Sequence, residues 1–240
     1  MISYDQRIDV SVIDNSEEHK LFAAILEELK IAQKNDKWKK LETYGDFNPS
    51  FWNERLGDNE LKLIHEQAQI KNFPDFTLVG SRHITIFDHF RVDGSKWTKS
   101  KGSSLMSMQS NTNIGVNKST VEYNKENWIM NLTKVFENHA QKLKIYDSNI
   151  RNYIRDLNLE SSHKDLKKPR EVWFLIEDKS NIKIPKEAFI TLSKLLNNKQ
   201  SPNAVIYVVN PFDDVKLNLN NIAFIKNDNN ALIELSHVYD

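Results

Sequence analysis

Two uninterrupted apolar runs in the second half of the chain limit its fold more than any other feature. They are Val172–Ile176 and Ala204–Val209, and continuous apolar runs of this length are typical of strands covered on both faces. Between them, Pro185–Leu196 has the spacing of an amphipathic helix with proline in its first turn. A strand, a crossover helix and a second strand form a parallel pair. The sequence therefore predicts a parallel β-α-β unit, followed by a final strand over Ile222–Ile225.

The middle of the chain predicts an antiparallel hairpin and then a helix. Phe76–Val79 and His83–Val92 have the composition of strands, and residues 80–82 form a connection short enough for a hairpin. Apolar residues at helical spacing follow over Asn124–Tyr146, and a second helical stretch over Ser148–Leu159 continues after a break.

The first 70 residues have mainly helical patterns. Ser16–Lys34 combines an N-cap serine with one apolar stripe, a helical stretch follows Pro49, and Asp58–Ile70 predicts a further helix. We therefore predict an α/β fold in which a mixed sheet contains an antiparallel hairpin and a parallel β-α-β unit, with helices on both faces. A helical N-terminal segment over residues 1–70 would precede an α/β core over residues 71–240, the two forming one compact unit.

Composition excludes several classes of function. The chain has 33 Lys+Arg, 33 Asp+Glu and no cysteine, so disulfides, thiolate metal sites and a cysteine nucleophile are excluded. The balanced charge provides no overall field for nucleic acid or membranes, although a local basic groove is compatible with it. Glycine-rich phosphate loops, zinc-binding spacings and a nucleophile elbow are absent. With no signal-peptide pattern and no long apolar run, we expect a cytoplasmic microbial protein with no membrane partner.

An acid within an apolar row is the feature most informative about chemistry. Strand alternation puts Asp88 on one face with four apolar residues. These are Ile84, Ile86, Phe90 and Val92. A carboxylate in that position must be paired, bind a metal ion or have a raised pKa. Asp75 opens the hairpin roughly opposite Asp88, and two converging carboxylates suit Mg²⁺ or Mn²⁺.

These features resemble the PD-(D/E)XK nuclease superfamily, over roughly residues 60–210. The likeness rests on an acid at Glu66, the Pro74-Asp75 pair at one strand, Asp88 on the next, and then a helix and a buried strand. The core of that superfamily runs α-β-β-β-α-β, and two acids and a lysine assemble a metal site that cleaves phosphodiester bonds. The resemblance implies that Asp75 is the first metal ligand, Asp88 the second, and Glu66 the upstream helical acid found in some members.

The lysine of the superfamily pattern is not in place. It belongs two residues after the second acid, where this chain has Phe90. Some members carry the lysine on another element, so Lys142 on the following helix is the candidate that would replace it. A second acid-any-lysine sequence, Glu177-Asp178-Lys179, follows a buried strand, but no hairpin precedes it. The pattern there favours a solvated strand end.

Other candidate residues surround the hairpin. Five of them could contact phosphates and stack on a base, although a solvated loop has the same composition. These are Arg91, Lys96, Trp97, Lys99 and Lys101. His89 lies on the face opposite Asp88, where it is a half-exposed strand histidine, a metal ligand or a general base. His139 lies on an apolar helix face, which favours a hydrogen-bonded core histidine over a ligand.

Two functions are compatible with this sequence. The first is a Mg²⁺- or Mn²⁺-dependent nuclease that hydrolyses DNA or RNA through Asp75, Asp88, Glu66 and Lys142. The alternative is a non-catalytic interaction protein, such as an immunity or defence-system component, on a similar scaffold. In that case Asp88 is neutralised by Arg82, Arg91 or another neighbouring side chain, and the polar loop after the hairpin binds a protein partner.

Overall fold

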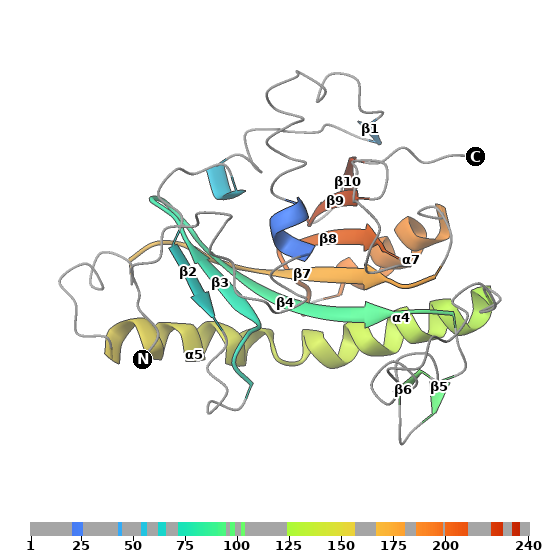
Figure 1. Ribbon diagram of the computed structural model, residues 1–240, viewed down its shortest axis with the longest axis horizontal. Helices are drawn as coiled ribbons and strands as arrows, with labels where there is room; N and C mark the ends of the chain where they lie inside the picture. Colours follow the sequence, from blue (N-terminus) through green and yellow to red (C-terminus); the bar gives the residue numbers. More distant parts are fainter. Residues whose placement is uncertain are drawn as a thin grey trace.

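The computed structural model describes thirteen stretches of the chain. They are residues 21–25, 43–44, 54–56, 62–65, 72–94, 97–98, 102–103, 124–156, 167–180, 186–198, 200–210, 222–227 and 232–235. The fold is α/β: helices flank a mixed eight-stranded sheet, and a separate two-stranded sheet lies outside it (Figure 1). No helix within these stretches is long and apolar enough to cross a membrane.

The large sheet has a simple strand order. From one edge to the other its strands are β1 (Thr43–Tyr44), β10 (Leu232–Leu235), β9 (Ile222–Asn227), β8 (Ala204–Val209), β7 (Arg170–Asp178), β4 (Ile84–Val92), β3 (Phe76–Val79) and β2 (Lys62–His65). The two-stranded sheet pairs β5 (Trp97–Thr98) with β6 (Gly102–Ser103). Strands β4, β7 and β8 are parallel neighbours, and the other pairs in the large sheet are antiparallel.

The two strongest sequence predictions are confirmed. Helix α7 (Lys186–Leu196) connects β7 to β8, which pair in parallel with Trp173 beside Ala204. Strands β3 and β4 form the predicted hairpin, with Phe76 opposite Phe87. Its turn is closed by a hydrogen bond from the Gly80 N–H to the His83 carbonyl, 2.9 Å long. Both units could be predicted from the local sequence, because the apolar residues that form each pattern are the residues buried in the core.

Two predictions near the sheet edges are wrong. A strand, β2, occupies Lys62–His65 where a helix over Asp58–Ile70 was expected, because this segment pairs with β3. Ile222–Ile225 does belong to a strand, β9, but it is not the final one, since β10 follows and pairs with it. Strands β1 and β2 lie within residues 1–70 and join the same sheet as the strands after residue 70.

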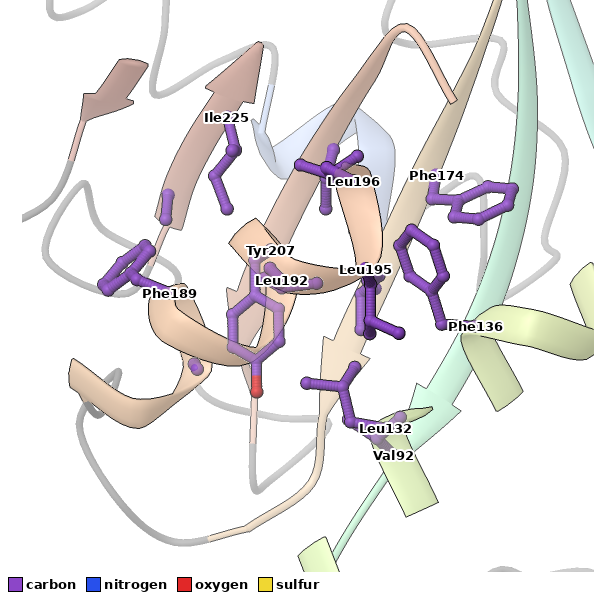
Figure 2. Close-up of a cluster of buried hydrophobic side chains, with 14 of the residues drawn as sticks. Val92, Leu132, Phe136, Phe174, Phe189, Leu192, Leu195, Leu196, Tyr207 and Ile225 are labelled. Carbon is purple, nitrogen blue, oxygen red and sulfur yellow. The ribbon is translucent and has the colours of Figure 1, made fainter. Parts of the chain in front are cut away.

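Three helices cover one face of the sheet. Helices α4 (Lys125–Ala140) and α5 (Leu143–Asp156) run nearly in line along it, and α7 lies beside α4 (Figure 1). The break between α4 and α5 falls at residues 141–142, earlier than the predicted break after Tyr146. Figure 2 shows the core beneath α4 and α7, where Leu132 and Leu192 meet Phe174 and Tyr207 from the strands.

A second core lies on the opposite face. Residues 21–25 are helical, and Leu21, Phe22 and Ile25 pack there against the sheet. Their sheet partners include Phe87 and Trp173, whose rings make an edge contact at 5.5 Å. The rest of the predicted helix Ser16–Lys34 lies outside the described residues. The sheet is thus covered by helix on both faces, as the sequence predicted.

Candidate functional site

Asp75 comes directly before β3, and Asp88 lies within β4, the partner strand of β3. Phe76 and Phe87 form the last paired row of the hairpin, so each acid lies one residue beyond that row. The Asp75 carboxylate accepts a hydrogen bond from the backbone N–H of His89, at 2.5 Å. Asp88 is buried on the face covered by α4 and α5, in the apolar row that alternation predicted.

The Asp88 carboxylate is held by one residue from each of two consecutive helices. Its Oδ2 contacts Nδ1 of His139 at the end of α4, and its Oδ1 accepts a hydrogen bond of 3.0 Å from the Tyr146 hydroxyl in α5. The ring of Phe90 stacks on His139 with centroids 4.5 Å apart. His139 is therefore hydrogen-bonded, as the sequence favoured, with the acid of the hairpin as its partner, but its side chain is half-buried rather than in the core.

Lys142 lies at the junction of these helices. It follows His139 by three residues and precedes Tyr146 by four, and backbone hydrogen bonds of 2.9 Å link it to both. Lys142 lies in the turn at residues 141–142, between the two helices that carry His139 and Tyr146. Its side chain is half-buried.

Several predicted site residues lie where nothing can be said of their side chains. Glu66, Lys96, Lys99 and Lys101 lie outside the described residues, and Trp97 is described only by its backbone in β5. In the part of the chain that the structure describes, no group of three or more His, Asp or Glu side chains is placed to hold a metal ion. Of the residues predicted to form the metal site, Asp75, Asp88 and Lys142 are those whose side chains the structure describes.

A second polar cluster lies at the carboxyl ends of the parallel strands, and we call it the Glu177 cluster. Strand β4 contributes His89 and Arg91, and β7 contributes Glu177. Lys179 directly follows β7, and Asn210 directly follows β8. Glu177 Oε1 accepts hydrogen bonds of 2.7 Å from both Lys179 Nζ and Asn210 Nδ2. Glu177 Oε2 lies 2.9 Å from Arg91 Nε and 3.4 Å from His89 Nε2.

This cluster contradicts the prediction of a solvated strand end. The side chains of Glu177 and Lys179 are only 3% and 1% exposed. Burial would raise the pKa of Glu177, but the neighbouring His89, with the hydrogen bond and positive charge of Lys179, holds it well below its usual range. Glu177 is therefore an ionised acid in the protein interior. Glu177 and Lys179 lie on one side of the strand and form an ion pair of 2.7 Å.

Asp178 belongs to a different network, on the opposite face from Glu177. It is fully buried and accepts hydrogen bonds from Trp128 Nε1 at 3.0 Å, from the Tyr207 hydroxyl, and from the N–H and hydroxyl of Ser180. Burial raises the pKa of Asp178, although these hydrogen bonds act in the opposite direction. Asp178 ties α4 and β8 to the end of β7, which is a structural role.

The two arginines suggested as partners of Asp88 pair with other acids. Arg91 contacts Glu177, and the exposed Arg82 lies 3.6 Å from Glu54. Sequence reasoning missed the Glu177 cluster, although one signal was present. Alternation along β4 places His89 and Arg91 on one side, and a buried acid on a neighbouring strand would be expected to face them.

Comparisons with protein-family models, with curated proteins and with solved structures gave no match.

Proposed function

We propose that this protein is a metal-dependent, nuclease-like protein that hydrolyses phosphodiester bonds in DNA or RNA, with its site on the β3–β4 hairpin. The observation that carries the proposal is the register of the hairpin, in which Asp75 and Asp88 each lie one residue beyond the last paired row and the Asp75 carboxylate accepts a hydrogen bond from the His89 N–H. Two carboxylates are hard oxygen ligands of the kind that Mg²⁺ and Mn²⁺ prefer.

The order of the elements supports the resemblance to the PD-(D/E)XK superfamily. Strands β2, β3 and β4 form an antiparallel meander, helices α4 and α5 follow, and β7 then pairs in parallel with β4. This is the β-β-β-α-β part of the core that the resemblance implies. Asp75 precedes the second strand of the meander and Asp88 lies in the third, where the two acids of the superfamily are expected.

The donor set fits a magnesium ion. Mg²⁺ is usually bound by one or two carboxylates and keeps several water molecules or substrate phosphate oxygens. Asp75 and Asp88 would hold the ion, and Glu66 remains a further candidate ligand. When bound, the ion supplies an activated water and stabilises negative charge on the phosphate. Lys142, in the turn between α4 and α5, is the candidate to place a positive charge beside the substrate phosphate.

A specific observation favours the second candidate, a non-catalytic interaction protein of the immunity or defence type. Phe90 occupies the lysine position and stacks on His139. Both oxygens of Asp88 already contact protein groups. In that case the hairpin acids stabilise the scaffold, and binding takes place elsewhere on the molecule.

Calorimetric titration with Mg²⁺ and Mn²⁺ separates the two candidates. For the nuclease we expect binding by the wild type, and at least a tenfold loss of affinity in Asp75→Asn and Asp88→Asn. Asp75 is only half-buried, so Asp75→Asn keeps the test informative if Asp88→Asn fails to fold. The matched control is Glu137→Gln, which removes an exposed carboxylate from α4 and should bind as the wild type does.

Cleavage assays complete the test. Linear and circular DNA and RNA are incubated with each protein and either metal, and cleavage should be lost in both aspartate variants and kept in Glu137→Gln. The proposal is overturned if the wild type neither binds the metals at millimolar concentration nor cleaves any substrate. It is also overturned if cleavage survives in both aspartate variants, because the activity would then come from another site or a contaminant.

A further inference from the structure

The solvent-facing side of helix α5 carries a row of basic residues, in a chain whose 33 basic and 33 acidic residues balance overall. We propose that this side binds the phosphate backbone of a nucleic acid. The residues that form it, which we call the α5 row, are Lys144, Ser148, Arg151 and Arg155. The inference deepens the proposed function by naming a surface for the nucleic acid, and it rests on that function for the choice of ligand.

The spacing of the α5 row puts its residues in one line. They follow one another at intervals of four, three and four positions, and residues three or four apart are neighbours on a helix surface. All of them are exposed. From Lys144 to Arg155 the row is about 16 Å long, at about 1.5 Å per residue. That length corresponds to about five phosphates of one DNA strand, which follow each other about every 3.4 Å along the duplex axis.

The opposite side of α5 is buried in the core. Tyr146, Ile150 and Ile154 are buried there and pack with Ile84 and other apolar side chains of the sheet. A helix with one basic side can also bind a lipid surface, but it does so by burying its apolar side in the bilayer. The apolar side of α5 already packs against the sheet, so the basic side is suited to a soluble polyanion rather than to a membrane.

One acid, Asp147, lies beside the α5 row, and its charge is balanced from the sheet. Arg170 Nε lies 2.6 Å from Asp147 Oδ1, and the Arg170 side chain is only 15% exposed. Arg151 is farther away, at 3.7 Å from Asp147 Oδ2, with a side chain 56% exposed. An exposed ion pair of this kind contributes little free energy. Arg151 can therefore exchange its contact with Asp147 for one with a phosphate at small cost.

The exposed side of the preceding helix has a different charge pattern. On α4, Lys125 and Lys134 alternate with Glu126 and Glu137, and all of these residues are exposed. Mixed signs of this kind are typical of a solvated helix face. Among the α5 residues whose side chains the structure describes as exposed, none is acidic. A single sign of charge along one side of a helix is the pattern expected of a surface that contacts phosphates.

Fluorescence anisotropy with labelled nucleic acids tests the inference. The probes are a short DNA duplex, an RNA duplex of the same sequence and the corresponding single strands, all in EDTA so that metal-dependent cleavage cannot occur. Three phosphate contacts give a slope of about −2.7 for the logarithm of the binding constant against the logarithm of the salt concentration on B-DNA. The affinity of the wild type for the DNA duplex should therefore fall about fortyfold between about 50 and about 200 mM salt.

The test variant replaces the three cations of the α5 row by glutamine. Its substitutions are Lys144→Gln, Arg151→Gln and Arg155→Gln. Binding should be at least about tenfold weaker than in the wild type at about 50 mM salt, with a salt slope near zero, because the counterions released by the three contacts are no longer displaced. Each single substitution should reduce the slope by about 0.9.

The matched control replaces three exposed cations outside α5, so that the net charge of the protein changes equally. Its substitutions are Arg82→Gln, Lys125→Gln and Lys194→Gln. This variant should bind within about twofold of the wild type and keep its salt slope, because the loss is expected only where phosphates are contacted. Urea unfolding of both variants shows whether each is folded under the conditions of the binding assay.

The inference is overturned if the wild type binds none of the probes at low salt, or if the test variant and the control bind them equally. It is also overturned if the wild type binds anionic phosphatidylserine vesicles in preference to every nucleic acid, because the α5 row would then serve a lipid surface. Weaker binding of DNA or RNA by the folded test variant, with the control unchanged, supports it, and the polymer bound more tightly is the one that the row recognises.

Binding in EDTA and metal-dependent cleavage can fail independently. If the wild type binds nucleic acid through the α5 row but neither binds metals nor cleaves, only the nuclease function is overturned. If cleavage depends on Asp75 and Asp88 while the test variant binds and cleaves as the wild type does, only the α5 surface is overturned.

Discussion

Glu177→Gln removes one buried negative charge while keeping the size of the side chain. In the folded protein, Lys179 Nζ and Asn210 Nδ2 each lie 2.7 Å from Oε1, and Arg91 Nε lies 2.9 Å from Oε2. Removing one partner of a buried ion pair costs about 3–5 kcal/mol, because charged groups that have lost their contact with water also lose their partner. For a chain of this size, that cost corresponds to a fall in Tm on the order of 10 °C.

The pH dependence follows from the sign of the pKa shift of Glu177. Burial acts to raise this pKa, but His89 and Lys179 together hold it well below the ordinary value of 4.5. A carboxyl group whose pKa is lower in the folded state stabilises the protein at pH values above its unfolded pKa, and this stabilisation is lost as the pH falls. The difference between wild type and Glu177→Gln should therefore be constant above about pH 5 and shrink below about pH 4.

Urea unfolding followed by tryptophan fluorescence measures both effects. The matched control is Glu187→Gln, because Glu187 forms a 2.7 Å ion pair with Lys125 but the two side chains are 40% and 53% exposed. An exposed pair of this kind contributes less than about 1 kcal/mol. The reasoning is refuted if Glu177→Gln lies within about 1 kcal/mol of the wild type at neutral pH, or if a larger difference persists unchanged at about pH 3.

Three further predictions concern the framework of the sheet. Tyr207→Phe should lower the free energy of unfolding by about 1–3 kcal/mol, because it removes a hydrogen-bond donor to buried Asp178. Burial raises the pKa of Asp178, and the Tyr207 hydroxyl stabilises its ionised form. The loss of stability should therefore grow with pH, as measured by urea unfolding at several pH values. Leu192→Ala should cost about 2–5 kcal/mol in the same assay, because Leu192 is on the buried side of α7 (Figure 2). Ile190→Ala is the control: this side chain of the same helix is 47% exposed, so its loss should change the stability by no more than about 0.5 kcal/mol. Asn124→Ala should lower the stability by about 1 kcal/mol, because Asn124 caps the first turn of α4, and equal urea midpoints for variant and wild type would contradict this.

Local sequence patterns were sufficient for the centre of the fold. Val172–Ile176 and Ala204–Val209 are buried on both faces, so each shows a continuous apolar run, and the helix between them shows its own period. The hairpin was predictable because a short polar turn separates two strands of matching pattern. In these elements, the contacts that stabilise the structure are made by the residues that create the pattern.

Patterns failed where pairing with a distant segment decides the structure. Lys62–His65 forms β2 because it can add to the free edge of β3. A short apolar pattern such as the one over Asp58–Ile70 is compatible with a helix or a strand. Whether the segment forms a helix or a strand depends on the strand that it pairs with, and that strand lies elsewhere in the sequence.

The candidate site shows the same division between what is local and what is not. Alternation along β4 correctly placed Asp88 on one face, but its partners His139 and Tyr146 come from helices about fifty residues later. Nothing near Asp88 in the sequence indicates them. The register that puts Arg91 opposite Glu177 is equally non-local, so the acid at the end of β7 was interpreted as solvated.

That register also decides which lysine can serve the hairpin. Lys179 lies two residues after an acid on the strand next to β4, so it appears to supply the lysine that Phe90 replaces. However, Glu177 pairs with Arg91, and Arg91 points to the face opposite Asp88 because it lies three positions after Asp88 along the strand. Lys179 shares that face, with Nζ 2.7 Å from Glu177. The sheet therefore separates Lys179 from Asp88, and Lys142, on the helices that hold Asp88, remains the cation to test in the proposed nuclease site.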